Sequence, residues 1–387
     1  MRKSQFVKGI LLSCLIALFI IPSAQADKKH ADDKEKHAAD KEKLAVDKVE
    51  EEGLSVIVLG SGGPVATPSG RASAGYLIFT DGKPRILMDA GGGTFQRLAA
   101  SGTNVKDLDI ILLSHLHLDH TGDLSPIIKT VYFHNRGANL NPKIPQSFPP
   151  GRTKTFRIFG PAANGIPFPP PSGLPAVPQY PASTEYVHNN YDAATGMERY
   201  LNIFSRAISG GIFSVTPTDV SPNWLAYNPK VLVDEGVGEN RLLITAVGVN
   251  HGPVPALAFR IEYKGKSIVY SGDTSSRSVA PNGNALANGG NMVEISEGAD
   301  LLIYDTAIMD DLPAGPSGAV FFTLHTTPSR IGEVAEAAGV KKLLLSHITP
   351  ITEPLLDKVE DLIRAQGYVG KIKRAKDLKV INLGDDD

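Results

Sequence analysis

Three imidazoles and a carboxylate stand within six consecutive positions of this chain. They are His115, His117, Asp119 and His120, and only Ser114 separates them from residues 108–113, which are mainly Ile and Leu. A short run of this kind predicts a buried strand, and open α/β sheets place their sites at the carboxyl ends of strands. Stacked polar side chains of this kind need partners if they are buried. A metal ion is the partner that satisfies all four, so the cluster predicts a metal centre.

The spacing of the cluster indicates more than one metal position. On an extended backbone His115, His117 and Asp119 would project to one side and His120 to the other. One short loop could then serve two metal positions a few Å apart. Imidazole and carboxylate donors without sulfur suit Zn²⁺ best, although Mn²⁺ or Fe²⁺ could also be held. We therefore predict two divalent metal ions, with zinc as the first choice.

Three more candidate ligands, His251, Asp273 and His347, occur later in the chain. Each follows a strand-like apolar run; the runs are residues 241–247, 266–270 and 342–345. Together with the His-x-His-x-Asp-His cluster, this order and rough spacing resemble those of the metallo-β-lactamase fold hydrolases. The resemblance extends over about residues 54–383 and so covers nearly the whole chain beyond the N-terminal segment.

The resemblance implies an α/β (α+β) fold, an αββα sandwich in which two mixed β-sheets pack face to face with helices outside. Composition and periodicity by themselves support only the alternation of strands and helices. The resemblance also divides the ligands into two sets: His115, His117 and His251 for one metal, and Asp119, His120 and His347 for the other. Asp273 would bridge both ions through its two oxygens, and Asp119 could accept the proton of the attacking water.

Two further residues indicate which branch of the family the chain resembles. Asp305 follows the apolar residues 301–304, and His325 begins a His-Thr-Thr sequence just before a predicted helix. A similar acidic residue and a His-Ser/Thr-Thr sequence lie beside the metals in the ribonuclease Z-like branch of phosphodiesterases and arylsulfatases. The resemblance implies that His325 is a general acid or anion-binding group and that Asp305 orients it. The alternative is that His325 caps the helix, and Asp305 stands where that branch usually has glutamate.

The N-terminus is typical of an export signal. A basic start precedes the apolar residues 9–21, and Ala24-Gln25-Ala26 offers a small-residue cleavage site. The apolar run is too short to span a bilayer comfortably. Cys14, the only cysteine, would leave with the signal peptide, which excludes a cysteine-ligated metal site in the mature protein. We expect a periplasmic or secreted protein with no membrane span once the signal is removed.

Composition suggests one main domain. Residues 1–26 are the predicted signal peptide, 27–53 a charged low-complexity spacer, and 54–387 the hydrolase domain, with a Pro-rich insertion at about 139–181. The formal net charge of −2 gives no strong signal for nucleic-acid binding. A small ester is therefore the expected partner, and we expect Tyr132, Phe133, Tyr180 and Trp224 to line the cleft that receives it. The sequence leaves the oligomeric state open.

These features favour a dinuclear hydrolase that cleaves a phosphodiester or a related small ester. Sulfate esters share the tetrahedral geometry of phosphate esters, so an arylsulfatase is the main alternative. Hydrolysis of a lactone or β-lactam fits less well. A non-catalytic metal-binding protein is the alternative from a different class, although binding alone would not require His325 beside two complete ligand sets.

Overall fold

The computed structural model describes residues 44–137, 156–165, 180–191, 196, 199, 215–275, 290–312 and 315–384. The predicted signal peptide, residues 27–43 of the predicted spacer and most of the Pro-rich insertion lie outside the described residues. Residues from Leu44 onward belong to one unit. Residues 44–53, which we predicted to be spacer, pack on that unit: Ala45 is buried, and the backbone N–H of Val46 donates to the carbonyl of Ser101 at 3.1 Å.

Two seven-stranded mixed sheets form the centre of this unit. The first has the order β14-β1-β2-β3-β4-β5-β6, and its strands are β1 (Leu54–Gly60), β2 (Gly75–Thr80), β3 (Lys83–Met88), β4 (Ile110–Leu112), β5 (Phe156–Pro161), β6 (Val215–Val220) and β14 (Val380–Asn382). The second has the order β13-β12-β11-β10-β9-β8-β7, and its strands are β7 (Lys230–Glu235), β8 (Leu242–His251), β9 (Val254–Tyr263), β10 (Lys266–Tyr270), β11 (Leu301–Asp305), β12 (Lys342–Ser346) and β13 (Lys371–Arg374).

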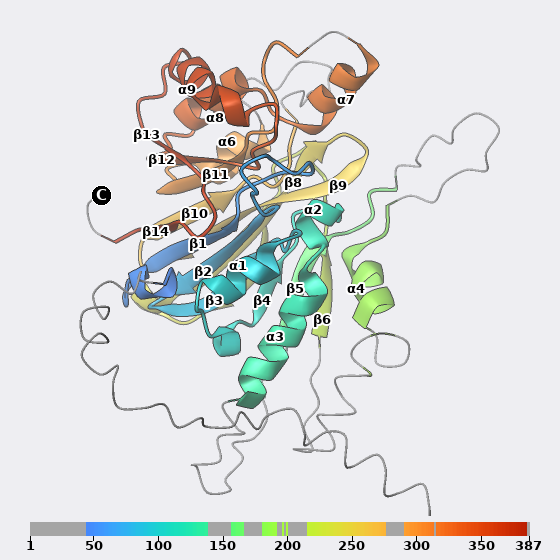
Figure 1. The fold of residues 1–387 in the computed structure, drawn as a ribbon, viewed down its shortest axis with the longest axis vertical. Coiled ribbons are helices and arrows are strands. Elements are labelled where there is room, and N and C mark those ends of the chain that lie inside the picture. The colour runs from blue at the N-terminus through green and yellow to red at the C-terminus, as the bar shows by residue number, and fades with distance from the viewer. Residues whose placement is uncertain are drawn as a thin grey trace, which may run out of the picture. The chain divides into compact units, whose positions relative to one another are not determined.

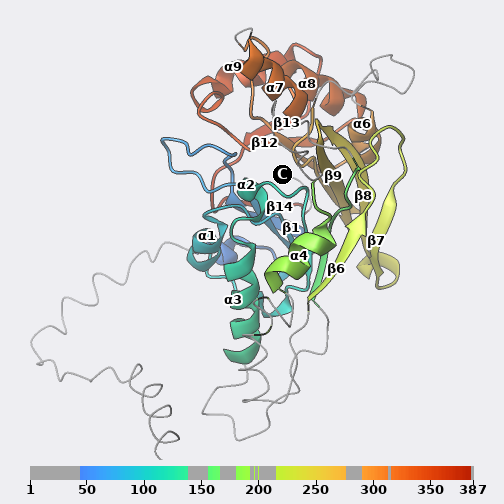
Figure 2. The same cartoon turned by 90° about the vertical axis from the view of Figure 1, so that its right-hand side faces the viewer.

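Helices cover the outer faces of both sheets, as Figures 1 and 2 show. The α-helices are α1 (Thr94–Ala100), α2 (Leu118–Thr121), α3 (Leu124–Gly137), α4 (Ser183–Tyr191), α6 (Asn291–Ser296), α7 (Pro316–Leu324), α8 (Pro328–Ala337) and α9 (Leu356–Arg364). The 3-10 helices are η1 (Val46–Lys48), η2 (Val105–Asp107), η3 (Gly238–Asn240) and η5 (Glu353–Leu355). Among the described residues, no helix combines the length and apolar character that crossing a membrane requires.

Three apolar layers hold the sheets and helices together. In the middle layer the inner faces of the two sheets meet, with Tyr76 of β2 and Phe259 of β9 fully buried. A second layer joins the first sheet to helices such as α3, and a third joins the other sheet to helices such as α8. Apolar side chains alternate between the two faces of each strand because successive residues point in opposite directions. The predicted αββα sandwich is confirmed.

The strand directions bring the carboxyl ends of several strands to one edge of the sandwich. Strands β3 to β6 run parallel to one another, as do β10 to β13, whereas the remaining neighbours are antiparallel. Because β8 and β10 both pair antiparallel with β9, β8 has the same direction as β10. The carboxyl ends of β8, β10, β11 and β12 therefore lie at the same edge of the second sheet.

A buried carboxylate ties three strands of the second sheet together. Asp300, just before β11, accepts hydrogen bonds from the Ser267 N–H and from Lys341 Nζ, each at 2.8 Å. Burial alone would raise the pKa of Asp300, but these two donors outweigh it and hold the pKa below its usual value. The stabilisation is therefore complete above the unfolded-state pKa and is lost as the pH falls through the lower folded-state pKa.

Replacing this carboxylate should lower the free energy of unfolding by an amount that depends on pH. We expect Asp300→Asn to lower the free energy of unfolding by about 1 kcal/mol at pH 7. The difference from wild type should begin to shrink as the pH falls below about 4, the usual pKa of an aspartate, and should vanish only below the lower folded-state pKa of Asp300. Urea unfolding at several pH values measures both quantities. Asp311→Asn, which removes an exposed partner of Lys358, is the control and should change stability little at either pH. A constant difference across the pH range would contradict this account of Asp300.

Candidate metal centre

All the residues predicted to bind metal or to take part in catalysis lie close together at the edge of the sandwich that holds the carboxyl ends of these strands. His115 and His117 follow β4, Asp119 and His120 lie in α2, His251 ends β8, Asp273 follows β10, Asp305 ends β11, His325 follows α7, and His347 follows β12. Their donor atoms fall into groups in which every atom lies within 4.8 Å of the others. Side chains that are up to 232 positions apart in the sequence (His115 to His347, 347 − 115) thus share one site.

The first group consists of three histidines, His115, His117 and His251. Nε2 of His115 lies 3.0 Å from Nδ1 of His117, and Nε2 of His251 lies 3.5 Å from the same atom. Burial lowers the pKa of each ring, to about 3 for His251. Three neutral imidazoles with converging nitrogens present lone pairs to one point, which is the arrangement that a divalent ion requires.

The second group combines Asp119, His120, Asp273 and His347. Nε2 of His347 lies 3.2 Å from Oδ2 of Asp119 and 3.2 Å from Nε2 of His120. Burial alone would lower the pKa of His347, but the carboxylates of Asp273 and Asp119 outweigh it and raise the pKa to about 10. The two carboxylates thus stabilise positive charge at this position, and a divalent ion could supply that charge in place of the imidazole protons.

Asp273 lies between the two groups and faces both. Its Oδ1 is 3.3 Å from Nε2 of His120 and 3.3 Å from Nε2 of His347. Its Oδ2 is 3.8 Å from Nε2 of His115 and 3.9 Å from Nε2 of His251. One oxygen is thus directed to each group, as the resemblance implied for a bridging carboxylate.

The donors fit a pair of metal ions in chemistry as well as in position. Oδ1 of Asp273 is buried and has no hydrogen-bond partner of normal geometry in the described part of the chain. A buried carboxylate oxygen of this kind is costly unless something positive satisfies it. Imidazole nitrogens and carboxylate oxygens are ligands that Zn²⁺, Mn²⁺ and Fe²⁺ accept. The described residues therefore could hold two divalent ions, whose identity the geometry leaves open.

The local backbone around Asp119 and His120 differs from our prediction. We predicted an extended chain that would send these two side chains to opposite sides, but Leu118–Thr121 is a helical turn, α2. The extended segment ends at His117, so the alternation stops there. Successive residues of a helix are about 100° apart around its axis, and this rotation directs both side chains to the second group.

His325 and Asp305 form a buried pair beside the second group. Nδ1 of His325 lies 2.7 Å from Oδ2 of Asp305 and 3.9 Å from Oδ2 of Asp273. Burial alone would lower the pKa of His325, but Asp305 outweighs it and raises the pKa above its usual value. His325 follows α7, and Thr327, not His325, precedes α8, which argues against the alternative that His325 caps the next helix. Asp273, Asp305, His325 and His347 are also close enough to form a third donor group.

Asp89 is a site residue that our sequence analysis missed. Its Oδ2 lies 2.7 Å from Nδ1 of His120 and accepts hydrogen bonds from the hydroxyls of Ser114 and Tyr270. Its φ of 55° is unusual for a residue other than glycine. Asp89 thereby fixes the ring of His120 so that Nε2 points into the second group. The sequence signal was weak, because a single aspartate followed by one alanine and three glycines is also typical of an ordinary turn.

Removal of Asp89 should weaken metal binding in the second group. A carboxylate that orients a ligating histidine contributes about 10–100-fold to metal affinity, so we expect a loss of that size for Asp89→Ala. Competition with a chromophoric chelator measures the affinity of each bound ion. One of the two ions should be lost first, whereas Asp300→Asn, which removes a carboxylate outside the site, should retain both. Unchanged affinity for both ions would remove Asp89 from the site.

Tyr180 lies at the margin of the first group. Its hydroxyl oxygen is 3.5 Å from Nε2 of His117, and the two ring centroids are 6.1 Å apart. We predicted that Tyr132, Phe133, Tyr180 and Trp224 line the cleft. Tyr180 is beside the metal centre, Trp224 lines a separate pocket described below, and the side chains of Tyr132 and Phe133 lie outside the described residues.

The fold and the donor groups define a metal-dependent hydrolase of the metallo-β-lactamase type. Residues 69–347 match the family model described as "Metallo-beta-lactamase superfamily", and the chain belongs to this family. It is 27% identical over 309 residues to a ribonuclease Z of Mycolicibacterium gilvum, covering 78% of this chain and 86% of that protein. It is 26% identical over 326 residues to a ribonuclease Z of Methanosarcina acetivorans, covering 78% of this chain and 91% of that protein.

Solved structures show the same fold. The metallo-beta-lactamase fold protein YhfI from Bacillus subtilis aligns with a TM-score of 0.54 and 20% identity, covering 85% of this chain and 100% of that one. The short form of human tRNase Z aligns with a TM-score of 0.54 and 19% identity, covering 84% and 98%. At these identities the likeness establishes the fold alone.

Proposed function

We propose that the protein is an exported dinuclear hydrolase that cleaves a phosphodiester or a related small ester. The observation that carries this proposal is the position of Asp273, with one carboxylate oxygen directed to each group of donors. Relatives named ribonuclease Z support a phosphodiester, because a ribonuclease cleaves phosphodiester bonds. Export rests on the basic start, the apolar run and the Ala-x-Ala sequence at the N-terminus.

The ligand residues supply the scaffold for this chemistry. His115, His117 and His251 would hold one ion, the second group would hold the other, and Asp273 would contact both. The chemistry that such a pair of cations supplies is activation of water near neutral pH and neutralisation of charge on the phosphoryl group. Asp119 stays ionised, because the neighbouring histidines outweigh burial and hold its pKa well below the usual range. Its carboxylate can therefore accept a hydrogen bond from the attacking water and orient it for attack.

His325 is placed to serve the leaving group. Its Nδ1 faces Asp305, so Nε2 is the ring nitrogen that remains to donate a proton. The raised pKa of His325 favours the protonated ring near neutral pH. Donation from Nε2 to the departing oxygen completes the reaction, and Asp305 holds the charged ring in position.

RNA is a weaker candidate substrate than a small ester, although the relatives act on RNA by name. The net charge of −2 provides no general attraction for a polyanion. An exported enzyme would also be separated from tRNA precursors. Sulfate esters fit the same tetrahedral geometry, so arylsulfatase activity is the alternative that the substrate test must separate from phosphodiesterase activity.

A substrate panel on the purified protein tests the proposal. We expect hydrolysis of bis(p-nitrophenyl) phosphate that a chelator abolishes and that added Zn²⁺ or Mn²⁺ restores. p-Nitrophenyl sulfate, a lactone, a β-lactam and precursor tRNA should be poorer substrates. Protein recovered from the periplasm of a bacterial host should begin at Asp27. Faster hydrolysis of the sulfate would assign an arylsulfatase instead, and two bound ions without turnover of any ester would assign a binding protein.

A further inference from the structure

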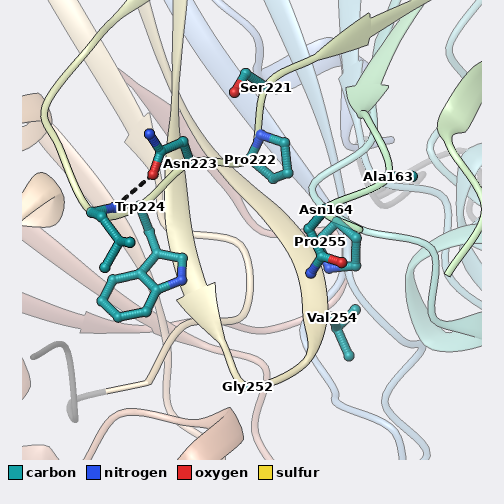
Figure 3. Close-up of a pocket in the computed structure, with 10 residues that line it drawn as sticks. Ala163, Asn164, Ser221, Pro222, Asn223, Trp224, Gly252, Val254 and Pro255 are labelled. Atoms are coloured by element: carbon teal, nitrogen blue, oxygen red, sulfur yellow. Dashed lines mark hydrogen bonds between the residues drawn. The ribbon is translucent and has the colours of Figure 1, made fainter. Parts of the chain in front are cut away.

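A pocket of about 300 Å³ lies beside the metal centre and is built from three separate segments. They are the loop after β5, residues 221–225 between β6 and β7, and the turn that joins β8 to β9. Figure 3 shows Trp224 beside one arm of the β8–β9 hairpin, Val254 and Pro255 on the other arm, and Gly252 at the tip. None of the candidate ligands or catalytic residues lines this pocket.

Specific contacts hold the three segments in place. Asn164 Nδ2 donates to the carbonyl of Pro253 at 2.8 Å, which ties the loop after β5 to the hairpin turn. The backbone of residues 222–223 packs against β8 at Gly248. A Cβ added to this glycine would lie 2.4 Å from the Pro222 carbonyl carbon, so only glycine fits here. Asn291 Nδ2 donates to the carbonyl of Gly248 at 2.8 Å. The pocket is therefore part of the packed structure of the hairpin.

The lining suits a flat, uncharged group. Trp224, which is half-buried, contributes an indole ring, and Pro222, Val254 and Pro255 contribute apolar surface. Asn223 and Asn164 place amide groups among them, and none of the described residues that line the pocket carries a charge. Aromatic faces bind other aromatic rings by stacking, whereas an uncharged lining gives a phosphate no oppositely charged partner. An aromatic ring is the group that this surface fits.

The pocket and the metal centre share one turn of the chain. Gly252 lines the pocket and is joined by a peptide bond to His251, a member of the first donor group. Nδ1 of His251 is held at 2.7 Å from the carbonyl of Leu324, so its Nε2 points away from that contact and toward the donor group. A molecule with a phosphoryl group at the metals and a short arm could therefore reach the pocket across this turn.

We propose that this pocket binds an uncharged aromatic ring of the ester substrate, either an aryl group or a nucleobase. The inference rests on the proposed function, because it takes the phosphoryl group to lie at the metals. The volume is at the lower end of small-ligand pockets, which run from about 300 to 1,000 Å³, and so fits a single ring system. The Trp224 indole is the principal contact, and the pocket makes the enzyme prefer aromatic esters over alkyl esters.

Trp224 provides a direct readout because it is the only tryptophan in the chain. Metal-loaded full-length protein is titrated with phenylphosphonate, with adenosine monophosphate and with methylphosphonate, which has no ring. We expect the emission of Trp224 to change with the first two and to stay constant with methylphosphonate. Benzyl alcohol, a ring without phosphorus, should produce the same change at higher concentration and without metal. The relative affinities of phenylphosphonate and the nucleotide separate an aryl site from a nucleobase site.

Kinetics of variants provide the second measurement. Loss of a stacking partner costs about 1–3 kcal/mol per ring, so Trp224→Ala should raise KM for bis(p-nitrophenyl) phosphate by about tenfold. KM for a dialkyl phosphodiester should change little, and Trp224→Phe, which keeps a ring, should restore most of the affinity. Tyr227→Ala removes an exposed aromatic side chain of the same segment outside the pocket lining, and it should leave both KM values unchanged.

The outcomes separate this inference from the proposed function. Ester hydrolysis with no emission change from any ring-containing probe, or with an unchanged KM in Trp224→Ala, overturns the aromatic pocket and leaves the hydrolase proposal intact. An emission change with benzyl alcohol and phenylphosphonate but no turnover of any ester supports the pocket and overturns the hydrolase proposal. Equal emission changes with methylphosphonate and phenylphosphonate also overturn the pocket, because the ring would then contribute nothing.

Discussion

Asp273→Ala is expected to remove the bound metal and the hydrolytic activity together. Both donor groups lose a ligand in this variant, because one oxygen of Asp273 faces His120 and His347 and the other faces His115 and His251. Loss of a residue that only orients a ligand already lowers metal affinity by about 10–100-fold, so loss of the shared ligand should exceed that range for both ions. Elemental analysis of the purified variant and its rate with bis(p-nitrophenyl) phosphate provide the two measurements.

Two control variants separate the role of Asp273 from a general effect of removing a buried charge. Asp300→Asn changes another buried aspartate outside the site and should keep both ions and full activity. Asp273→Asn keeps the size of the side chain but loses its charge, and it should behave like Asp273→Ala if charge on the bridging group is what holds the ions. An Asp273→Ala protein that retains two ions would show that the two groups are independent.

His325→Ala should have the second largest effect, and it should act on rate without loss of metal. The expected loss is about 10²–10⁴-fold in kcat for esters with poor leaving groups, which is the usual contribution of a general acid. A p-nitrophenolate leaving group needs little protonation, so the loss should be smallest there. A series of phosphodiesters with leaving groups of rising pKa measures this, and the rate should depend more steeply on leaving-group pKa in the variant than in the wild type.

Asp305→Asn and metal analysis complete this test. The amide introduced by this substitution could still contact Nδ1 of His325 but could not stabilise a charged ring, so the variant should lose less rate than His325→Ala, with the same dependence on the leaving group. The third donor group provides the competing interpretation, in which Asp273, Asp305, His325 and His347 hold an ion. If His325→Ala loses an ion, that interpretation replaces the general-acid role.

The position of the candidate metal ligands was predictable, because they follow apolar runs whose strand character is easily recognised. Strands of one direction bring their carboxyl ends to one edge, so residues as distant as His115 and His347 could be expected to meet. The division of the ligands into two groups came from the resemblance, and the structure places the same residues in the same two groups. The local backbone conformation was less predictable, because the four-residue helix α2 lies in a segment whose sequence predicts an extended loop.

Other parts of the site have no pattern that can be recognised in the sequence. Asp89 contacts His120 from the segment after β3, and its positive φ could not be inferred from the glycines that follow it. The pocket beside Trp224 depends on the packing of three segments through Gly248, Asn164 and the β8–β9 turn. Such contacts depend on tertiary packing, for which neither hydrophobic periodicity nor ligand spacing gives information.

The number of metal ions bound per chain tests the central claim most directly. Purified protein, stripped with a chelator and dialysed against Zn²⁺ or Mn²⁺, should bind two ions per chain, and anomalous scattering from crystals should place one between His115, His117 and His251 and the other between Asp119, His120 and His347, with Asp273 touching both. A protein that binds no divalent ion under any of these conditions, or that binds its ions away from these side chains, would contradict the account.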